Sequence, residues 1–274
     1  MQRLWVGILL LLWTGVAAAY EPPNRDQLWY TNAFFGRVNP LGAIDYFKVG
    51  YKRRLEIGDT ALGRDAYVFA GAQVSASPAF ARAGVFFEAE PTGLLQFGAL
   101  YQYGYYFGTF DQIASFSSTD EVFADSFLKR LSGDGQTGPR SGHVVNAWIQ
   151  PKFKLGFFAV RDTLTMIWQQ LDLPAGEIAF YDQIVDRMAP NGGFMLTNDA
   201  DVMFFWDDNG LVGLRYTYSA SFFDGSETGP GALPHHRIGP LLAYTFFDHK
   251  ERARFDRPTL FALVQWWLQH PYRG

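Results

Sequence analysis

The chain has 274 residues, of which 18% are aromatic and 18% are charged, with a formal net charge of −4 and no cysteine. About a quarter of the residues of a typical soluble domain are charged, so this chain is poor in charge. The lack of cysteine excludes disulfides, thiol catalysis and thiolate metal ligands. The acidic balance, without a long basic run, indicates that nucleic acid is not a partner.

Residues 1–19 have the three parts of a secretory signal peptide. Arg3 gives a positive start, Leu4–Val16 is an apolar stretch, and Ala17–Ala19 fits an A-x-A cleavage site. The alternative is a membrane-anchoring helix, but the apolar run from Leu4 to Ala19 has 16 residues, fewer than the roughly 18 that indicate a span. The sequence therefore predicts cleavage after Ala19 and a mature chain that begins at Tyr20.

The remaining chain has no apolar run long enough for a transmembrane helix, yet it alternates between apolar and polar residues with a period of two. In the segment 143–155, Val145 and Ile149 lie on one face while Asn146 and Gln150 lie on the other. Many such segments run for about 11–14 residues, longer than the usual strand of about 5–6 residues in globular proteins. The segments are 27–36, 43–55, 65–77, 79–90, 94–107, 143–155, 163–171, 177–188, 194–206, 211–223, 236–247 and 258–269.

This pattern predicts an all-β fold, a transmembrane antiparallel up-and-down β-barrel of about 12 strands, because a strand spans a bilayer with only every second residue apolar. The predicted count falls to ten strands if the segment 27–36 and one neighbouring segment do not form strands. The segment 177–188 also fits a helical period. Residues 20–40 form an N-terminal segment with room for a first strand, and residues 41–274 form the barrel.

The longest connection, Gly108–Ser141, is predicted to contain a short amphipathic helix built on Val122, Phe123, Phe127, Leu128 and Leu131. Ser118 and Glu121 have the spacing of a capping box before it. A long loop with its own helix is often functional, but it could equally fold over the barrel mouth for packing alone.

At this point the chain resembles bacterial outer-membrane β-barrel proteins, and the resemblance lies in pattern rather than in a specific motif. It implies a location in the outer membrane of a diderm bacterium, insertion by a barrel assembly machinery, short periplasmic turns and longer outer loops. Members usually end in an aromatic residue, whereas here Tyr272 stands two residues before the end. Strand counting also places two long loops, 108–141 and 225–234, on opposite sides.

Charged residues on the less apolar faces of the strands are the candidate site. A lipid-facing Lys or Arg at mid-bilayer costs about 2–4 kcal/mol, so these side chains are expected to point into the lumen. They could line a channel or binding site that selects solutes by size and charge, or they could form a salt-bridged interior that only stabilises the barrel. The candidates are Lys48, Lys52, Arg82, Glu88, Glu90, Lys152, Lys154, Asp199, Asp201 and Arg215.

Catalytic and metal-binding motifs are weak. Outer-membrane lipid hydrolases commonly use a His-x-Ser pair, and none of the five histidines has serine two residues later, although a pair from different strands stays open. The adjacent His235 and His236 would point to opposite faces of a strand, and Asp207-Asp208-Asn209 lacks the spacing of a calcium loop. We expect no enzyme activity, no metal and no cofactor.

The sequence predicts a passive pore or small-ligand transporter in the outer membrane. The alternatives are a non-permeating structural or adhesive barrel, an outer-membrane lipid hydrolase, and a water-soluble periplasmic barrel. The expected partners are outer-membrane lipid, the assembly machinery and small solutes.

Overall fold

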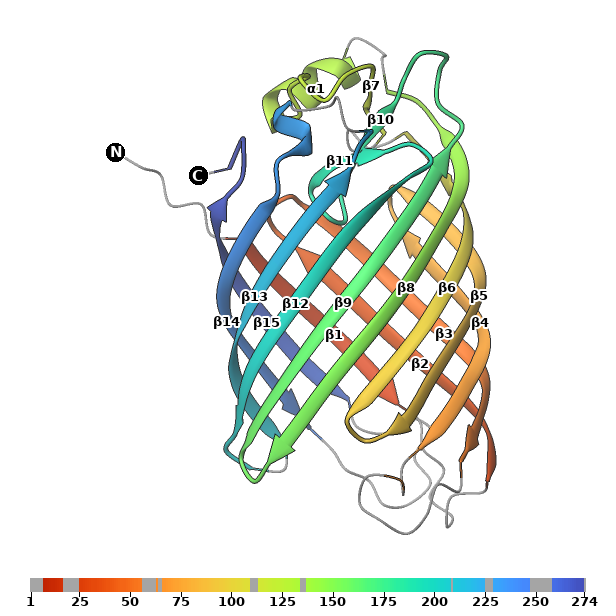
Figure 1. Cartoon of the computed structure of the whole chain (residues 1–274), viewed down its shortest axis with the longest axis vertical. Coiled ribbons are helices and arrows are strands. Elements are labelled where there is room, and N and C mark those ends of the chain that lie inside the picture. The colour runs from red at the N-terminus through yellow and green to blue at the C-terminus, as the bar shows by residue number, and fades with distance from the viewer. Residues whose placement is uncertain are drawn as a thin grey trace.

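Long antiparallel strands form the wall of a tilted barrel in the computed structural model of the chain (Figure 1). The structure describes residues 25–55, 63, 66–108, 113–133, 137–207, 209–224, 229–246 and 258–273, and the backbone of 7–16. Eleven wall strands lie in the ranges from residue 25 onward. They are β2 (Asp26–Arg37), β3 (Gly42–Arg54), β4 (Tyr67–Ser77), β5 (Phe80–Thr92), β6 (Leu95–Tyr106), β8 (Arg140–Leu155), β9 (Phe158–Leu171), β12 (Gly193–Phe205), β13 (Gly210–Phe222), β14 (His235–Thr245) and β15 (Thr259–Gln269).

Each of these strands pairs with the next wall strand in the chain, which gives the predicted up-and-down order. A further strand, β1 (Gly7–Val16), pairs antiparallel with both β15 and β2 and closes the ring. This strand lies within the predicted signal peptide. Because both of its neighbours run antiparallel to it, β2 and β15 run in the same direction. A mature chain without β1 could therefore close only through a parallel pair.

The N-terminus of the mature protein decides between these arrangements. We expect an intact mass that lacks 19 residues, because the apolar stretch and the Ala17–Ala19 site match a signal peptide. Phe35 and Phe261 both pair with Leu11, so β1 holds them about 10 Å apart, too far for a disulfide. Cysteines at these two positions should thus not cross-link in a chain that keeps β1 between them. A full-length mass without a cross-link would assign β1 to the barrel.

Alternate residues of the wall strands divide into an apolar outward face and a more polar inward face. Outward Val85 and Ile149 are 62% and 45% exposed, whereas inward Ser75 and Gln102 are 0% and 2% exposed. This is the reverse of a soluble barrel, whose buried residues are mostly apolar. A strand of about 13 residues tilted by about 45° is roughly 30 Å tall, which covers the hydrocarbon core of a bilayer.

Outward aromatic side chains gather near both ends of the wall, where amphipathic rings favour the membrane interface. Tyr101 and Tyr103 pack on His143 in the half of the barrel nearer the C-terminus of β15. At the other end Phe157 stacks on Phe204, and Trp206 follows β12 with 53% of its surface exposed. Among the described residues no helix has the length and apolar character needed to cross a membrane.

A cap of short elements covers one end of the barrel, shown at the top of Figure 1. It contains a small three-stranded sheet in the order β11-β10-β7, together with a helix and a single 3-10 turn. These elements belong to connections between wall strands and do not join the wall. They are β7 (Ser115–Phe116), α1 (Asp125–Gly133), β10 (Ala179–Asp182), β11 (Arg187–Pro190) and η1 (Pro230–Ala232).

The cap corrects the prediction that residues 177–188 form a wall strand or a helix. All eight residues of β10 and β11 are buried, so this hairpin has no lipid-facing side and therefore no alternation. Since one predicted wall strand is removed from the count, the loops 108–141 and 225–234 lie at the same end of the barrel. The prediction that they lie on opposite sides was wrong.

The predicted helix within 108–141 is present as α1, but the capping box is not. Glu121 accepts hydrogen bonds from the backbone N–H and the hydroxyl of Ser117 at 2.8 and 2.9 Å. This contact shapes a turn that ends before the helix begins at Asp125. The amphipathic face packs inward through Leu128, which is buried with Phe123 in the core of the cap.

Candidate functional site: the barrel lumen and its cap

The ten charged residues predicted to line the lumen all lie on the inward face of the wall. Cross-strand register places them beside inward neighbours such as Gln73, which pairs with Lys48, and Gln150, which follows that face toward Lys152. The strands that carry them are β3, β5, β8, β12 and β13. The residues so placed are Lys48, Lys52, Arg82, Glu88, Glu90, Lys152, Lys154, Asp199, Asp201 and Arg215.

Two lysine–glutamate ion pairs link β5 to β3 and to β8 across the inner face of the wall. Lys48 Nζ lies 3.5 Å from Glu88, and Lys152 Nζ lies 2.7 Å from Glu90. The Tyr67 hydroxyl donates to Glu88 at 2.6 Å. These contacts compensate the charges of both acids in the lumen, so neither is free to attract cations alone.

The opposite part of the wall holds a denser network centred on Asp201, whose side chain is fully buried. Arg161 contacts one carboxylate oxygen at 2.5 Å, and Arg215 contacts the other at 2.6 Å. Arg215 also reaches Asp199 at 3.3 Å, and Thr217 donates to Asp199 at 2.5 Å. Arg161 was absent from the predicted site because the predicted segment 163–171 began after it, whereas β9 begins at Phe158.

The remaining three predicted cations lie against aromatic rings, where the ring face attracts a positive charge. The Arg82 guanidinium is 4.4 Å from the centroid of Phe80. Lys52 Nζ is 3.8 Å from the centroid of Tyr67, and Lys154 Nζ is 3.9 Å from that of Phe205. The lumen is therefore narrowed by rings as well as by ion pairs.

The cap is fastened to the C-terminal segment through the buried carboxylate of Asp186. Arg273 contacts it twice, through a 3.0 Å hydrogen bond and a 2.6 Å ion pair that lacks hydrogen-bond alignment. The Tyr181 hydroxyl donates to the same carboxylate at 2.6 Å. Burial alone would raise the pKa of Asp186, but the charge and hydrogen bond of Arg273 outweigh it and hold that pKa below its usual range.

The segment after β15 is thus a strap over the cap. Arg273 also binds Asp125 of α1 at 2.8 Å, and Tyr272 packs edge-on against Phe123 with 4.7 Å between ring centroids. Burial lowers the pKa of the neighbouring His270 to about 4. The aromatic residue near the chain end, expected from the family resemblance at the last position, contributes to this packing instead.

Arginines fasten the cap to the wall at two further points. Arg37, at the end of β2, donates to the backbone carbonyls of Gln183 and Ile184 in the β10–β11 turn. On the other side Arg187 of β11 donates to the Ser221 hydroxyl at 2.6 Å and to the Leu233 carbonyl at 3.3 Å. Neither arginine was predicted, because 177–188 was assigned to the wall.

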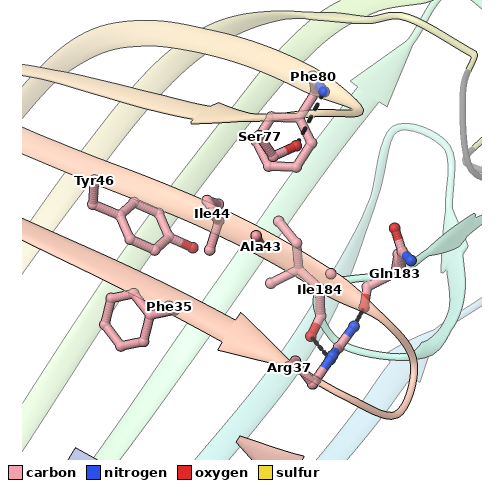
Figure 2. Close-up of a pocket in the computed structure, with 10 residues that line it drawn as sticks. Phe35, Arg37, Ala43, Ile44, Tyr46, Ser77, Phe80, Gln183 and Ile184 are labelled. Carbon is pink, nitrogen blue, oxygen red and sulfur yellow. Dashed lines mark hydrogen bonds between the residues drawn. The ribbon is translucent and has the colours of Figure 1, made fainter. Parts of the chain in front are cut away.

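Two cavities lie beside the Arg37 contact. The first has a volume of about 280 Å³, and Figure 2 shows Phe35, Ile44, Tyr46 and Phe80 around it, with Arg37 at one edge. The second has about 180 Å³ and lies toward β13, β14 and β15, with Arg37 and Ile184 again on its boundary. An apolar chamber and a basic chamber therefore adjoin below the cap.

The histidines do not form a serine–histidine pair within the described part of the chain. His143 and His236 face outward and hydrogen bond to Tyr101 and Tyr216. His235 is buried, and its ring has no hydrogen-bond partner. His249 lies outside the described residues. The absence of enzyme activity stays a prediction.

Two carboxylates on the outward face depart from the expected pattern. Asp45 accepts a hydrogen bond from Asn32 at 2.8 Å, and Asp162 accepts one from Asn198 at 2.6 Å. An outward acid costs less than an outward lysine or arginine in a barrel wall, and each has an amide donor. Within the described residues no group of three metal-ligating side chains is present.

Comparison with known proteins finds only distant structural similarity. No protein-family model matches the chain, and no curated protein matches it. Several solved structures are similar at TM-scores below 0.4. They include CymD, a monoaromatic hydrocarbon channel (9% identity, TM-score 0.39, covering 100% of this chain and 90% of CymD), the translocator domain of autotransporter NalP from Neisseria meningitidis (9%, 0.34, 95% and 88%), and the outer membrane protein OpdK from Pseudomonas aeruginosa (10%, 0.20, 96% and 97%).

The barrel architecture of this chain is seen directly in its strand order and in its outward apolar face.

Proposed function

We propose that the chain is an outer-membrane β-barrel that conducts or binds small solutes and is closed at one end by its cap. The observation that carries this proposal is the inverted arrangement of side chains, with apolar residues outward and polar or charged residues inward. An apolar exterior of this extent suits lipid rather than water. The exposed outward residues that support it include Val85, Ile149, Leu164, Val202, Val212, Leu214 and Leu242.

The predicted signal peptide and the family resemblance support a location in the outer membrane of a diderm bacterium. Outer-membrane lipid and the barrel assembly machinery would then be partners. A twelve-strand wall follows if β1 stays in the protein, and an even number of strands is usual for bacterial barrels.

The cap favours a gated channel for small solutes over an open general pore. Roughly 16–18 strands are needed for a wide aqueous channel, and this wall is smaller. The two cavities below the cap have volumes of about 280 and 180 Å³, which suit small molecules. The cap is held by ionic and hydrogen-bonded contacts, such as those of Arg37 and Arg273, and by apolar packing of Phe180 and Val185 on the inner face of the wall.

Conductance of the purified protein in planar bilayers tests the proposal. Replacing Lys48, Lys52, Lys152 and Lys154 with glutamate should shift the ion selectivity toward cations, because all four side chains lie in the lumen. The selectivity of Arg53→Glu should stay close to wild type, since Arg53 lies at an outward position of β3. Unchanged selectivity in the fourfold variant would remove the support for a conducting lumen.

The alternative of a non-permeating structural barrel is favoured by one specific observation. The ion pairs of Glu88, Glu90 and Asp201 inside the wall also suit a structural barrel that conducts nothing. A lack of conductance even after the cap contacts have been broken would favour that function. The lipid hydrolase alternative would require lipid hydrolysis that is lost on replacement of a serine or histidine.

A further inference from the structure

Arg237 of β14 is an inward arginine of the wall that has no acidic partner among the described residues. Its guanidinium lies 5.2 Å from the ring centroid of Trp267 and makes no hydrogen bond or ion pair with any residue that the structure describes. Arg161 and Arg215, by contrast, both contact Asp201. Charged groups removed from water are normally paired, so the inward guanidinium of Arg237 is available to an anion from solution.

The nearest acid is already occupied. Asp199 accepts hydrogen bonds from Arg215 at 3.3 Å and from the Thr217 hydroxyl at 2.5 Å. Gln265 donates to Thr217 at 2.9 Å and holds that hydroxyl in place. These contacts hold the carboxylate of Asp199 on Arg215, and Arg237 has no acid within ion-pair distance among the described residues.

Arg237 faces the basic chamber of about 180 Å³. Arg37, Arg215 and Arg237 line this chamber together with a single acid, Asp199, which leaves a surplus of two positive charges. The donors of Arg37 that make contacts all bind backbone carbonyls, and these neutral acceptors do not cancel its charge. The chamber is therefore electrostatically suited to an anion.

The rest of the lining is apolar or uncharged. Trp267, Leu263 and Ile184 present hydrocarbon and aromatic surface beside Arg237, and Asn39 adds a polar group. A bare inorganic anion would leave that apolar surface without contact. An organic anion would use both parts, because a planar guanidinium binds a carboxylate through two parallel hydrogen bonds.

We propose that the basic chamber binds a small organic carboxylate, with the carboxylate on Arg237 and the apolar body against Trp267, Leu263 and Ile184. This inference rests on the proposed channel function and names the class of solute that its lumen holds. The surplus of positive charge on one side of the chamber indicates an anionic group in the ligand, and the apolar lining on the other side indicates a hydrocarbon body.

Binding of 4-fluorobenzoate, followed by ¹⁹F NMR on the protein in nanodiscs, tests the site without any transport measurement. Saturable binding is expected, and Arg237→Gln should weaken it by about thirtyfold or more, as is typical when one partner of a charge-assisted pair is removed. Arg237→Lys should bind with intermediate affinity, since it keeps the charge but not the bidentate geometry. Arg53→Gln, which removes an arginine at an outward position, should bind like wild type.

Two competitors define the ligand class. The neutral 4-fluorobenzyl alcohol should bind at least about thirtyfold more weakly than the carboxylate, and inorganic phosphate should not displace 4-fluorobenzoate. Effective displacement by phosphate would overturn the assignment to an organic carboxylate. Equal affinity in wild type and Arg237→Gln would overturn the site.

A second variant tests whether the cap keeps the ligand from reaching the chamber. The titration is repeated on Arg273→Ala, in which the cap is expected to be loosened, and an absence of saturable binding in both proteins would overturn the proposal. Binding without bilayer conductance would leave the carboxylate site in place and count against the channel. Conductance without binding would support the channel and overturn the carboxylate site.

Discussion

Replacing Arg273 with alanine is expected to loosen the cap while the barrel wall stays folded. The substitution removes the only arginine that contacts the buried carboxylate of Asp186 among the described residues, and it also frees Asp125 of α1. Removing one partner of a buried ion pair costs about 3–5 kcal/mol, because the other charge is left without compensation. That loss falls on the cap, since Asp186 lies in the turn between β10 and β11.

Hydrogen exchange of the cap measures this effect directly. Amides of β10 and β11 should exchange faster in Arg273→Ala, whereas those of β4 and β5 should keep wild-type protection. Arg130→Ala serves as the matched control, because Arg130 of α1 lies over the ring of Phe127 at 4.7 Å on the exposed side of the helix. If cap exchange rose equally in both variants, the strap would have no special role.

A double variant separates the ion pair from its side effects. Asp186→Leu combined with Arg273→Met removes both charges, and replacing a buried pair with apolar residues is often close to neutral. The double variant should therefore protect the cap better than Arg273→Ala alone. A cap that is equally loose in both would show that the carboxylate of Asp186 is not the cause.

Replacing Asp201 with alanine is expected to destabilise the wall itself. Asp201 is the shared anion of Arg161 and Arg215, so its loss leaves two inward arginines without that partner. A cost of about 3–5 kcal/mol is expected for breaking a buried network in this way. Asp201→Asn keeps one acceptor oxygen but replaces the other with an NH₂ donor, so it should still lose much of this stability because the charge is absent and a donor would face an arginine.

Urea unfolding of the protein in detergent micelles, monitored by the heat-modifiable shift in gel mobility, measures the stability of the wall. The midpoint should fall strongly for Asp201→Ala and less when Arg161→Met and Arg215→Met are added to it. Asp162→Ala is the control, since Asp162 faces outward and contacts only Asn198 at 2.6 Å in the hydrogen bonds described. A midpoint for Asp201→Ala equal to that of the control would contradict the network's role.

The wall could be predicted from the sequence because one physical constraint acts on every strand. Lipid outside and polar contacts inside impose the same period of two on each segment, so Val145 and Ile149 separate from Asn146 and Gln150 in the sequence as they do in the structure. The same constraint placed charges such as Lys152 and Asp201 on the inward face.

The β10–β11 hairpin of the cap could not be predicted because it has no lipid-facing side. In β10 and β11 every residue is buried, and burial on all sides leaves no period to detect. The strap had no signal either, since Asp186 and Arg273 are 87 residues apart and only the folded barrel brings them together. In the sequence, Arg237 follows two histidines that were considered as metal ligands. That it has no acidic partner depends on which side chains the fold brings near it, so the sequence does not indicate it.

The division of each strand between lipid and lumen is tested most directly with single cysteines in this cysteine-free chain. Nitroxide labels at Val85, Ile149 and Val212 in liposomes should collide with oxygen in the bilayer and be shielded from a water-soluble relaxation agent. Labels at Gln73, Gln102 and Thr217 should show little contact with lipid. If the two sets showed the same lipid contact, or if the first set were shielded from lipid and the second exposed to it, the membrane-spanning barrel would be contradicted.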